Sequence, residues 1–196
     1  MSTVKAGRKL NVGCGRNPTP GWINLDSAAL PGVDVVADLE LCATTPCPLA
    51  DESIDEFLLS HVLEHIKHPL PLMQELWRTA LPDARMVVRV PYGATDDAYE
   101  DPTHVRQYFL NSFGYFCQPY YWRADYGYRG DWQPERITLI VSKVKHQGLS
   151  PQDILERVMT LRNVVQEMVA ELRCVKPRRE PKRELQKAPE IKIKLV

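Results

Sequence analysis

Short apolar runs alternate with polar and glycine-rich turns along most of the chain. Runs that indicate strands lie at residues 9–12, 22–26, 33–39, 53–61, 85–91 and 136–143, and patterns that indicate helices lie at 69–80 and 104–116. Strands that alternate with helices are typical of an open α/β sheet with mostly parallel strands. The sequence therefore predicts an α/β domain.

The ends of the first strands carry the chemistry of a nucleoside site. Gly13-Cys14-Gly15 follows the first strand, and Asp26 ends the second. In open α/β sheets ligands bind outside the carboxyl ends of the strands; glycine lets the backbone approach the ligand, and a carboxylate accepts hydrogen bonds from ribose hydroxyls. A Gly-x-Gly turn alone also suits a simple tight bend, so the prediction depends on the combination.

Residues 8–110 resemble the class I S-adenosylmethionine-dependent methyltransferases. The glycine motif corresponds to residues 11–15, the ribose acid to Asp26, and the adenine-side acidic motif to Asp38-Leu39, while residues 60–65 resemble the end of the fourth strand and the opening of the next helix. The resemblance implies a doubly wound, Rossmann-like, mostly parallel sheet with a closing antiparallel hairpin, and S-adenosylmethionine as cofactor. The cofactor-binding residues that it implies are Asn11, Gly13, Cys14, Gly15, Asp26, Asp38, Leu39, Ser60 and His61.

The sequence departs from the family pattern at three places. Only ten residues separate Gly15 from Asp26, too few for the usual helix, and residues 81–85 lack the common double glycine. Asn11 stands where the family often has an acid, and its amide can still hydrogen-bond the amino-acid end of the cofactor. A short bacterial-type branch without the helix between strands one and two is implied.

Candidate catalytic residues follow the fifth strand. Methyl transfer from a sulfonium depends mainly on positioning, with a base needed only when the acceptor retains its proton. His104 is the candidate base and Asp101 the group that orients it, whereas Glu64 and His65 are weaker candidates. The alternative is that Asp101 simply begins a helix.

Candidate substrate-binding residues come next along the chain. Arg106 can hold an anionic group by bidentate contact, and Tyr108 opens an aromatic-rich segment that ends at Trp132. Such rings suit the wall of a pocket for a sugar or a planar acceptor. They equally suit the packing of a hairpin core.

Residues 61–65 read His-Val-Leu-Glu-His and also match the His-x-x-Glu-His pattern of a zinc protease helix. His61 ends a strand-like run, however, whereas a protease helix would contain the whole motif. We therefore expect no metal.

The composition predicts one medium-sized domain. The chain has 196 residues, of which 44% are hydrophobic and 26% charged. The five cysteines form no Cys-x-x-Cys pair, which favours reduced thiols. Residues 1–9 lack the apolar segment of a secretory signal and no run is long enough to cross a membrane, so we expect a cytoplasmic location.

The chain divides into three expected regions: a methyltransferase-like domain at 1–147, an amphipathic helix at 148–175 and a basic flexible tail at 176–196. The helix shows a heptad seam at Ile154, Val158, Leu161, Val165, Met168 and Leu172, which fits packing on the sheet or a homo-oligomer through residues 151–174. Residues 173–196 hold nine basic and three acidic side chains, so a nucleic-acid contact is a weaker alternative to a solvated tail. Residues 191–195 alternate with period two and suit an edge strand when a partner is present.

The sequence predicts a methyltransferase that acts on an oxygen or nitrogen of a small-molecule or glycan acceptor, without a membrane partner. The alternative is a catalytically inactive scaffold of the same fold that acts through the heptad helix and the basic tail. Asn11, the missing helix and the altered turn before strand five all fit that alternative.

Overall fold

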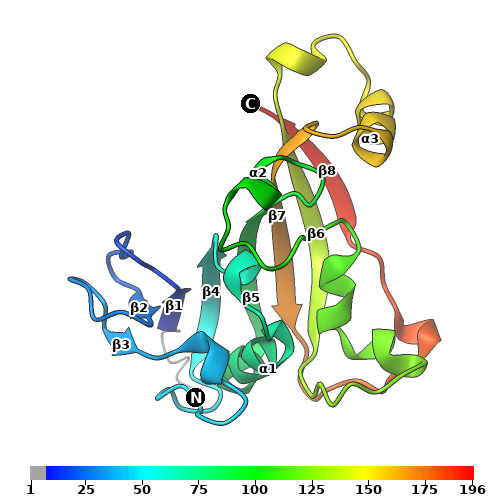
Figure 1. The fold of residues 1–196 in the computed structure, drawn as a ribbon. Helices are drawn as coiled ribbons and strands as arrows, with labels where there is room; N and C mark the ends of the chain where they lie inside the picture. Colours follow the sequence, from blue (N-terminus) through cyan, green and yellow to red (C-terminus); the bar gives the residue numbers. More distant parts are fainter. Residues whose placement is uncertain (1–7) are drawn as a thin grey trace, which may run out of the picture.

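The computed structural model describes residues 8–196; residues 1–7, which the expected first domain includes, lie outside the described residues. An eight-stranded sheet crosses the molecule in the order β3-β2-β1-β4-β5-β7-β6-β8 (Figure 1). Its strands are β1 (Arg8–Val12), β2 (Ile23–Asp26), β3 (Val35–Val36), β4 (Ile54–Ser60), β5 (Ala80–Pro91), β6 (Trp132–Val141), β7 (Val165–Cys174) and β8 (Glu190–Leu195).

Strands β1 to β5 are mutually parallel, and β7 inserts antiparallel between β5 and β6. The predicted mostly parallel α/β sheet with an antiparallel closing pair is therefore confirmed. The helices are α1 (Pro69–Thr79), α2 (Asp97–Glu100) and α3 (Pro151–Thr160), and short 3₁₀-helices lie at η1 (Leu39–Leu41), η2 (Leu63–His65), η3 (Ser112–Phe116), η4 (Gln118–Trp122), η5 (Val144–His146) and η6 (Arg183–Leu185). Residues 13–22 form turns without a helix in this described part of the chain, as the short spacing predicts.

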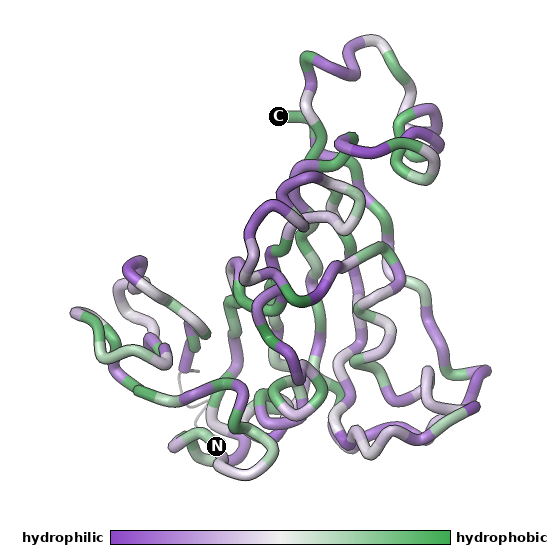
Figure 2. Tube along the Cα trace, in the orientation of Figure 1, coloured by the Kyte–Doolittle hydropathy of each residue, from purple (hydrophilic) through white to green (hydrophobic). Residues whose placement is uncertain are grey.

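The two faces of the sheet differ in polarity, and Figure 2 shows the alternation along the central strands. The apolar face is buried and includes Leu10, Phe57, Met86, Ala170, Leu172, Ile137 and Leu139. Helix α1 packs on this face, where the Trp132 indole donates to the Met73 carbonyl at 2.9 Å and meets Phe57 edge to face. Parallel strands with one polar face are unusual, because both faces are normally covered by helices.

The opposite, charged face pairs its side chains across neighbouring strands. Lys9 contacts Glu56 at 2.9 Å, and Arg136 contacts Glu171 at 3.2 Å. These pairs are partly exposed, so each adds little stability. They make the face compatible with solvent and thereby fix which side of each strand faces the core.

The predicted helix at 104–116 is wrong for its first half. Residues 104–111 are irregular because their backbone groups bond elsewhere: the N–H groups of Val105 and Arg106 both donate to the Glu64 carbonyl, and Gly93 N–H donates to the Tyr108 carbonyl. Only η3 is helical in that range. The segment is thereby held against the ends of β4 and β5.

The predicted amphipathic helix at 148–175 is also wrong beyond Thr160. Helix α3 begins with a capping box between Ser150 and Asp153 and ends at Thr160, and Asn163 adopts a left-handed φ of 60°. Residues 165–174 then form β7 in the interior of the sheet. A continuous helical seam over 151–174 is excluded, because half of the seam positions belong to a central strand.

The expected flexible tail at 176–196 is ordered against the sheet. Strand β8 pairs in parallel with β6 of the same chain, from Arg136 opposite Glu190 to Val141 opposite Leu195. The prediction of an edge strand at 191–195 is thus correct, but this strand pairs with β6 of the same chain and not with a separate partner. Aliphatic side chains at alternate positions extend the sheet by one strand.

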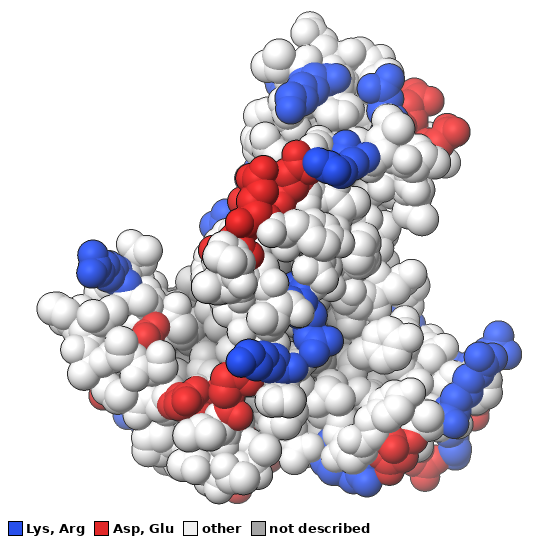
Figure 3. All heavy atoms as spheres, viewed as in Figure 1, with Lys and Arg blue, Asp and Glu red and all other residues white. Residues whose placement is uncertain are grey.

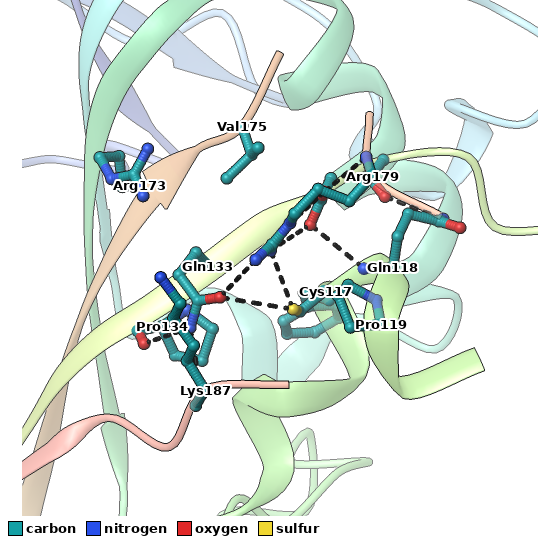
Figure 4. Close-up of polar contacts among 12 residues, drawn as sticks. Cys117, Gln118, Pro119, Gln133, Pro134, Arg173, Val175, Arg179 and Lys187 are labelled. Carbon is teal, nitrogen blue, oxygen red and sulfur yellow. Dashed lines mark hydrogen bonds and ion pairs between the residues drawn. The ribbon is translucent and has the colours of Figure 1, made fainter. Parts of the chain in front are cut away.

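Arg179 anchors the segment that leads to β8. Figure 4 shows its guanidinium reaching toward Gln133 and Cys117. The same network includes Asp131, which is fully buried. The guanidinium contacts the Asp131 carboxylate at 2.7 and 2.8 Å. Residue 179 is therefore a structural ion-pair partner rather than part of a solvated basic patch.

Candidate active site

The glycine turn after β1 has two glycines with different surroundings. Gly13 has a φ of 65°, and a Cβ there would lie 2.6 Å from a methyl carbon of Val62. Gly15 has a φ of 52°, and none of residues 8–196 would come within 4 Å of a Cβ there. Gly13 lets the turn pack against the residues after β4, and Gly15 leaves open space beside the strand ends.

Asp26 joins this turn to the end of β2. One carboxylate oxygen accepts the Gly15 N–H at 2.8 Å and the other accepts the Ala28 N–H at 3.0 Å. The side chain is neither fully buried nor fully exposed. A carboxylate has about four acceptor positions, so Asp26 retains capacity for two ribose hydroxyls.

Other residues of the expected cofactor site have mixed surroundings. Cys14 is buried and its N–H donates to the Leu25 carbonyl; burial, and next the charge of Asp26, raise the pKa of its thiol. Asp38 caps η1 by accepting the Glu40 N–H at 2.9 Å, and Leu39 is buried beneath it. Asp26 is the last residue of β2 and Asp38 lies two residues after β3, so the two acids lie at the ends of neighbouring strands.

The side-chain nitrogen of Asn11 is engaged by the loop that follows β1. Its buried amide nitrogen contacts the Asn17 carbonyl, the Thr19 hydroxyl and the Asn24 side-chain oxygen at 3.1–3.3 Å. An amide has two hydrogens to donate, and these partners account for both. Asn11 thus holds this loop through its nitrogen, and the predicted contact of its side chain with the cofactor could use only the side-chain oxygen.

His61 lies where β4 ends at Ser60 and adopts a left-handed φ of 55°. Its Nδ1 contacts Glu64 at 3.2 Å and its Nε2 contacts Glu167 at 3.0 Å. The hydrogen bond to Glu64, followed by the charges of both carboxylates, raises the pKa of His61. Glu167 also accepts two hydrogen bonds from Arg89, so the site includes two residues that sequence reasoning missed.

Of these two residues, Arg89 and Glu167, only the first could have been predicted from the sequence. Arg89 is a polar side chain close to the end of β5 and is paired in register with Ser60, so strand-end polarity could have identified it. Glu167 falls within the predicted helix. Its position next to His61 becomes visible only when β7 is placed beside β5.

The expected Asp101 and His104 pair does not form a hydrogen bond. The nearest oxygen of Asp101 lies 3.9 Å from His104 Nε2. Asp101 accepts instead from the Thr103 hydroxyl and N–H, which lower its pKa. The same hydroxyl lies 2.9 Å from His65 Nδ1, so the structure connects Asp101 with His65 rather than directly with His104.

A cavity of about 510 Å³ lies beside α1 and η3. Arg106 lines it and donates to the Lys67 carbonyl at 3.0 Å, and Tyr115, Tyr121 and Tyr126 provide aromatic surface. Tyr108 also lines the cavity, but it is 2% exposed, its hydroxyl donates to Leu63, and burial raises its pKa. Arg106 is therefore accessible to a substrate, whereas Tyr108 is mainly a core residue.

A second cavity of about 640 Å³ lies between the end of β5 and α3. Phe109 lines both cavities, and the second is lined by Asp96 and Glu100 together with Arg162, which pairs with Asp96. Figure 3 shows acidic side chains gathered over α2 at this place. The two cavities thus flank one aromatic side chain and differ in charge.

Residues 10–88 match the model of the methyltransferase domain family. A search of curated proteins gave no match. Solved structures share the fold: a SAM-dependent methyltransferase from Archaeoglobus fulgidus has 17% identity and a TM-score of 0.59, with 86% of this chain and 87% of that chain covered.

Two further solved structures are similar. The YcgJ protein from Bacillus subtilis has 15% identity and a TM-score of 0.53, covering 87% of this chain and 92% of that one. A Thermotoga maritima SAM-dependent methyltransferase, described as a possible histamine N-methyltransferase, has 13% identity and a TM-score of 0.54, covering 88% and 84%. At these identities the likeness shows a shared fold.

The glycine turn, Asp26 and strands β2 to β4 all lie within the matched segment. Among residues 8–196, no helix is long and apolar enough to cross a membrane. S-Adenosylmethionine is the cofactor of the matched domain, and the residues present fit it: Gly15 leaves space where Asp26 presents its carboxylate. Residues 10–88 therefore match a methyltransferase domain, and the chain shares the fold of S-adenosylmethionine-dependent methyltransferases.

Proposed function

We propose that the protein transfers the methyl group of S-adenosylmethionine to an oxygen or nitrogen atom of a small-molecule or glycan acceptor. The observation that carries the proposal is the contact between the Asp26 carboxylate and the Gly15 N–H, which supports a ribose-binding role for a carboxylate beside an open backbone turn. Bound there, S-adenosylmethionine supplies an electrophilic methyl group. The residues of this chain bind it and orient the acceptor.

The cavity lined by Arg106 supports a small acceptor. Its volume of about 510 Å³ is within the usual range for small-molecule sites. Tyrosine rings that combine an apolar face with a polar tip bind both planar groups and sugars. The scaffold alternative has less support, because the second half of the predicted heptad helix and the end of the predicted free tail are strands of the sheet.

The cofactor site is tested by calorimetric titration with S-adenosylmethionine and, separately, S-adenosylhomocysteine. Wild-type protein should bind both, and Asp26→Asn should weaken binding by about 1–3 kcal/mol, because the ribose hydroxyls lose a charged acceptor. Asp83→Asn is the matched control, since Asp83 is exposed and pairs with Arg173 in the β5–β7 region. Equal affinity of Asp26→Asn and wild type would remove Asp26 from the site.

The acceptor site is tested with an anionic acceptor identified by transfer of a labelled methyl group. Arg106→Ala should raise KM for that acceptor about tenfold while the affinity for S-adenosylmethionine stays constant, because a guanidinium contact with an anion is lost. Arg129→Ala is the control, since Arg129 is exposed and pairs with Asp125. An unchanged KM would place the acceptor elsewhere.

A further inference from the structure

We propose that Glu64, His65 and His104 form a binding site for one divalent transition-metal ion. One potential ligand atom of each residue lies within 4.8 Å of those of the other two. Glu64 and His65 belong to η2 immediately after β4, and His104 comes from the loop after α2. The folded chain thus brings together two imidazoles and one carboxylate from separate segments.

Glu64 supplies a buried carboxylate with one free oxygen. Its side chain is 2% exposed, and its Oε1 contacts His61 Nδ1 at 3.2 Å. Its Oε2 is buried and has no hydrogen-bond partner in the part of the chain that the structure describes. A buried carboxylate oxygen without a partner is costly, and a cation would remove that cost.

His104 likewise supplies a buried side-chain atom without a hydrogen-bond partner in the described part of the chain. Its side chain is 8% exposed, and Nδ1 lacks a hydrogen-bond partner among residues 8–196. Its other nitrogen, Nε2, faces the Asp101 carboxylate at 3.9 Å. Two independent side chains, each more than nine-tenths buried, therefore present unused ligand atoms.

His65 completes the set with a nitrogen that its neighbours leave free. Its Nδ1 contacts the hydroxyl and the carbonyl of Thr103 at 2.9 and 3.3 Å. Nε2 is then the nitrogen available to a metal. The His65 ring lies 4.8 Å from that of His104, between ring centroids, in an edge-to-face arrangement.

Two of the three ligands are thus held at one atom by a second residue: Glu64 by His61 and His65 by Thr103. Metal sites commonly have this outer layer of contacts, which orients the ligands and selects the histidine tautomer. The site differs from a protease His-x-x-Glu-His site, because His61 is engaged by Glu64 and Glu167 instead of by a metal.

Zinc fits the ligand chemistry best among common probes. Two histidines and a glutamate with an open fourth position are typical of catalytic zinc, and Fe²⁺ also accepts two histidines and a carboxylate. Tetrahedral zinc holds ligand atoms about 3.3 Å apart, so ligand atoms that lie within 4.8 Å of one another must approach by at most about 1.5 Å. This assignment replaces both the expectation of no metal and the role of His104 as a base.

The test is calorimetric titration of chelator-treated protein with Zn²⁺, together with Tm measured at increasing Zn²⁺. We expect one ion per chain, a Tm that rises with Zn²⁺, and at least about a hundredfold weaker binding in His104→Ala and His65→Gln. His68→Ala is the control, because His68 is exposed and outside the cluster. It should bind like wild type.

Several results would overturn the proposal: no stoichiometric binding, full affinity in both cluster variants, or loss of binding in the His68→Ala control. Absorption of the Co²⁺ complex provides a second readout, since thiolate charge-transfer bands would assign the ion to cysteines instead. Circular dichroism distinguishes a lost site from a misfolded variant, and His65→Gln keeps a polar group at the partly exposed position. Titration with S-adenosylmethionine is separate, so failure of one site leaves the other testable.

Discussion

Replacing Asp131 by alanine should lower the free energy of unfolding by about 3–5 kcal/mol, the cost of leaving one member of a buried ion pair without its partner. Asp131 is fully buried and accepts from the Arg179 guanidinium, the Arg179 N–H and the Gln118 N–H. The neighbouring Cys117 thiol cannot replace the carboxylate, since burial raises its pKa to about 12 and keeps it neutral.

Urea unfolding followed by circular dichroism measures this loss. Asp125→Ala is the matched control: Asp125 also pairs with an arginine, Arg129, but both side chains are exposed, so the loss should stay below about 1 kcal/mol. The double variant Asp131→Leu and Arg179→Met should recover part of the stability, because neither charge remains buried. Equal losses for Asp131→Ala and Asp125→Ala would contradict the proposed anchor.

The second large effect concerns the cofactor. Gly15→Leu should abolish measurable binding of S-adenosylmethionine, because the new side chain would project into space that no described residue occupies within 4 Å of its Cβ. It would also replace glycine at a φ of 52°, a conformation that other residues adopt with strain. Isothermal titration of folded variant protein measures the loss.

Gly148→Leu is the control that distinguishes steric blocking of the cofactor site from backbone strain at a positive φ. Gly148 has a φ of 79° and equally open surroundings among the described residues, but it lies in the turn before α3. We expect both variants to be destabilised, with cofactor binding lost only in Gly15→Leu. Retained binding in Gly15→Leu would mean that the cofactor does not approach the turn at this residue.

The cofactor half of the sheet follows from local sequence. Each strand from β1 to β4 is a short apolar run, and the glycines or polar residues after them mark the carboxyl ends of parallel strands. The spacing between Gly15 and Asp26 also correctly predicts a loop in place of a helix. Period and turn chemistry are sufficient to predict these strands, because β1, β2 and β3 pair in chain order.

Residues 161–175 show where such reasoning failed. Val165, Met168 and Leu172 satisfy a heptad spacing, but Met168, Ala170, Leu172 and Cys174 also alternate with period two and are buried on one face of β7. The left-handed Asn163 separates the strand from α3. Counting Ala170 and Cys174 as apolar would have favoured a strand.

Side-chain partners were the least predictable part of the site. Asp101 and His104 are close in sequence, yet Asp101 bonds to Thr103, while His61 meets Glu167 from a strand more than a hundred residues away. These contacts depend on side-chain rotation and on strand order, which periodicity does not specify. The sequence predicted that the site lies at the carboxyl ends of the parallel strands, but not which side chains hydrogen-bond with one another there.

The position of β7 between β5 and β6 has a consequence during synthesis of the protein on the ribosome. Strands β1 to β5 are complete once residue 91 has been made, whereas the second neighbour of β5 is residues 165–174. Until those residues emerge, the edge of β5 is unpaired, and unpaired edges promote association with other chains. We expect nascent chains that end before residue 165 to depend on chaperones, although they already contain every residue of the glycine turn and Asp26.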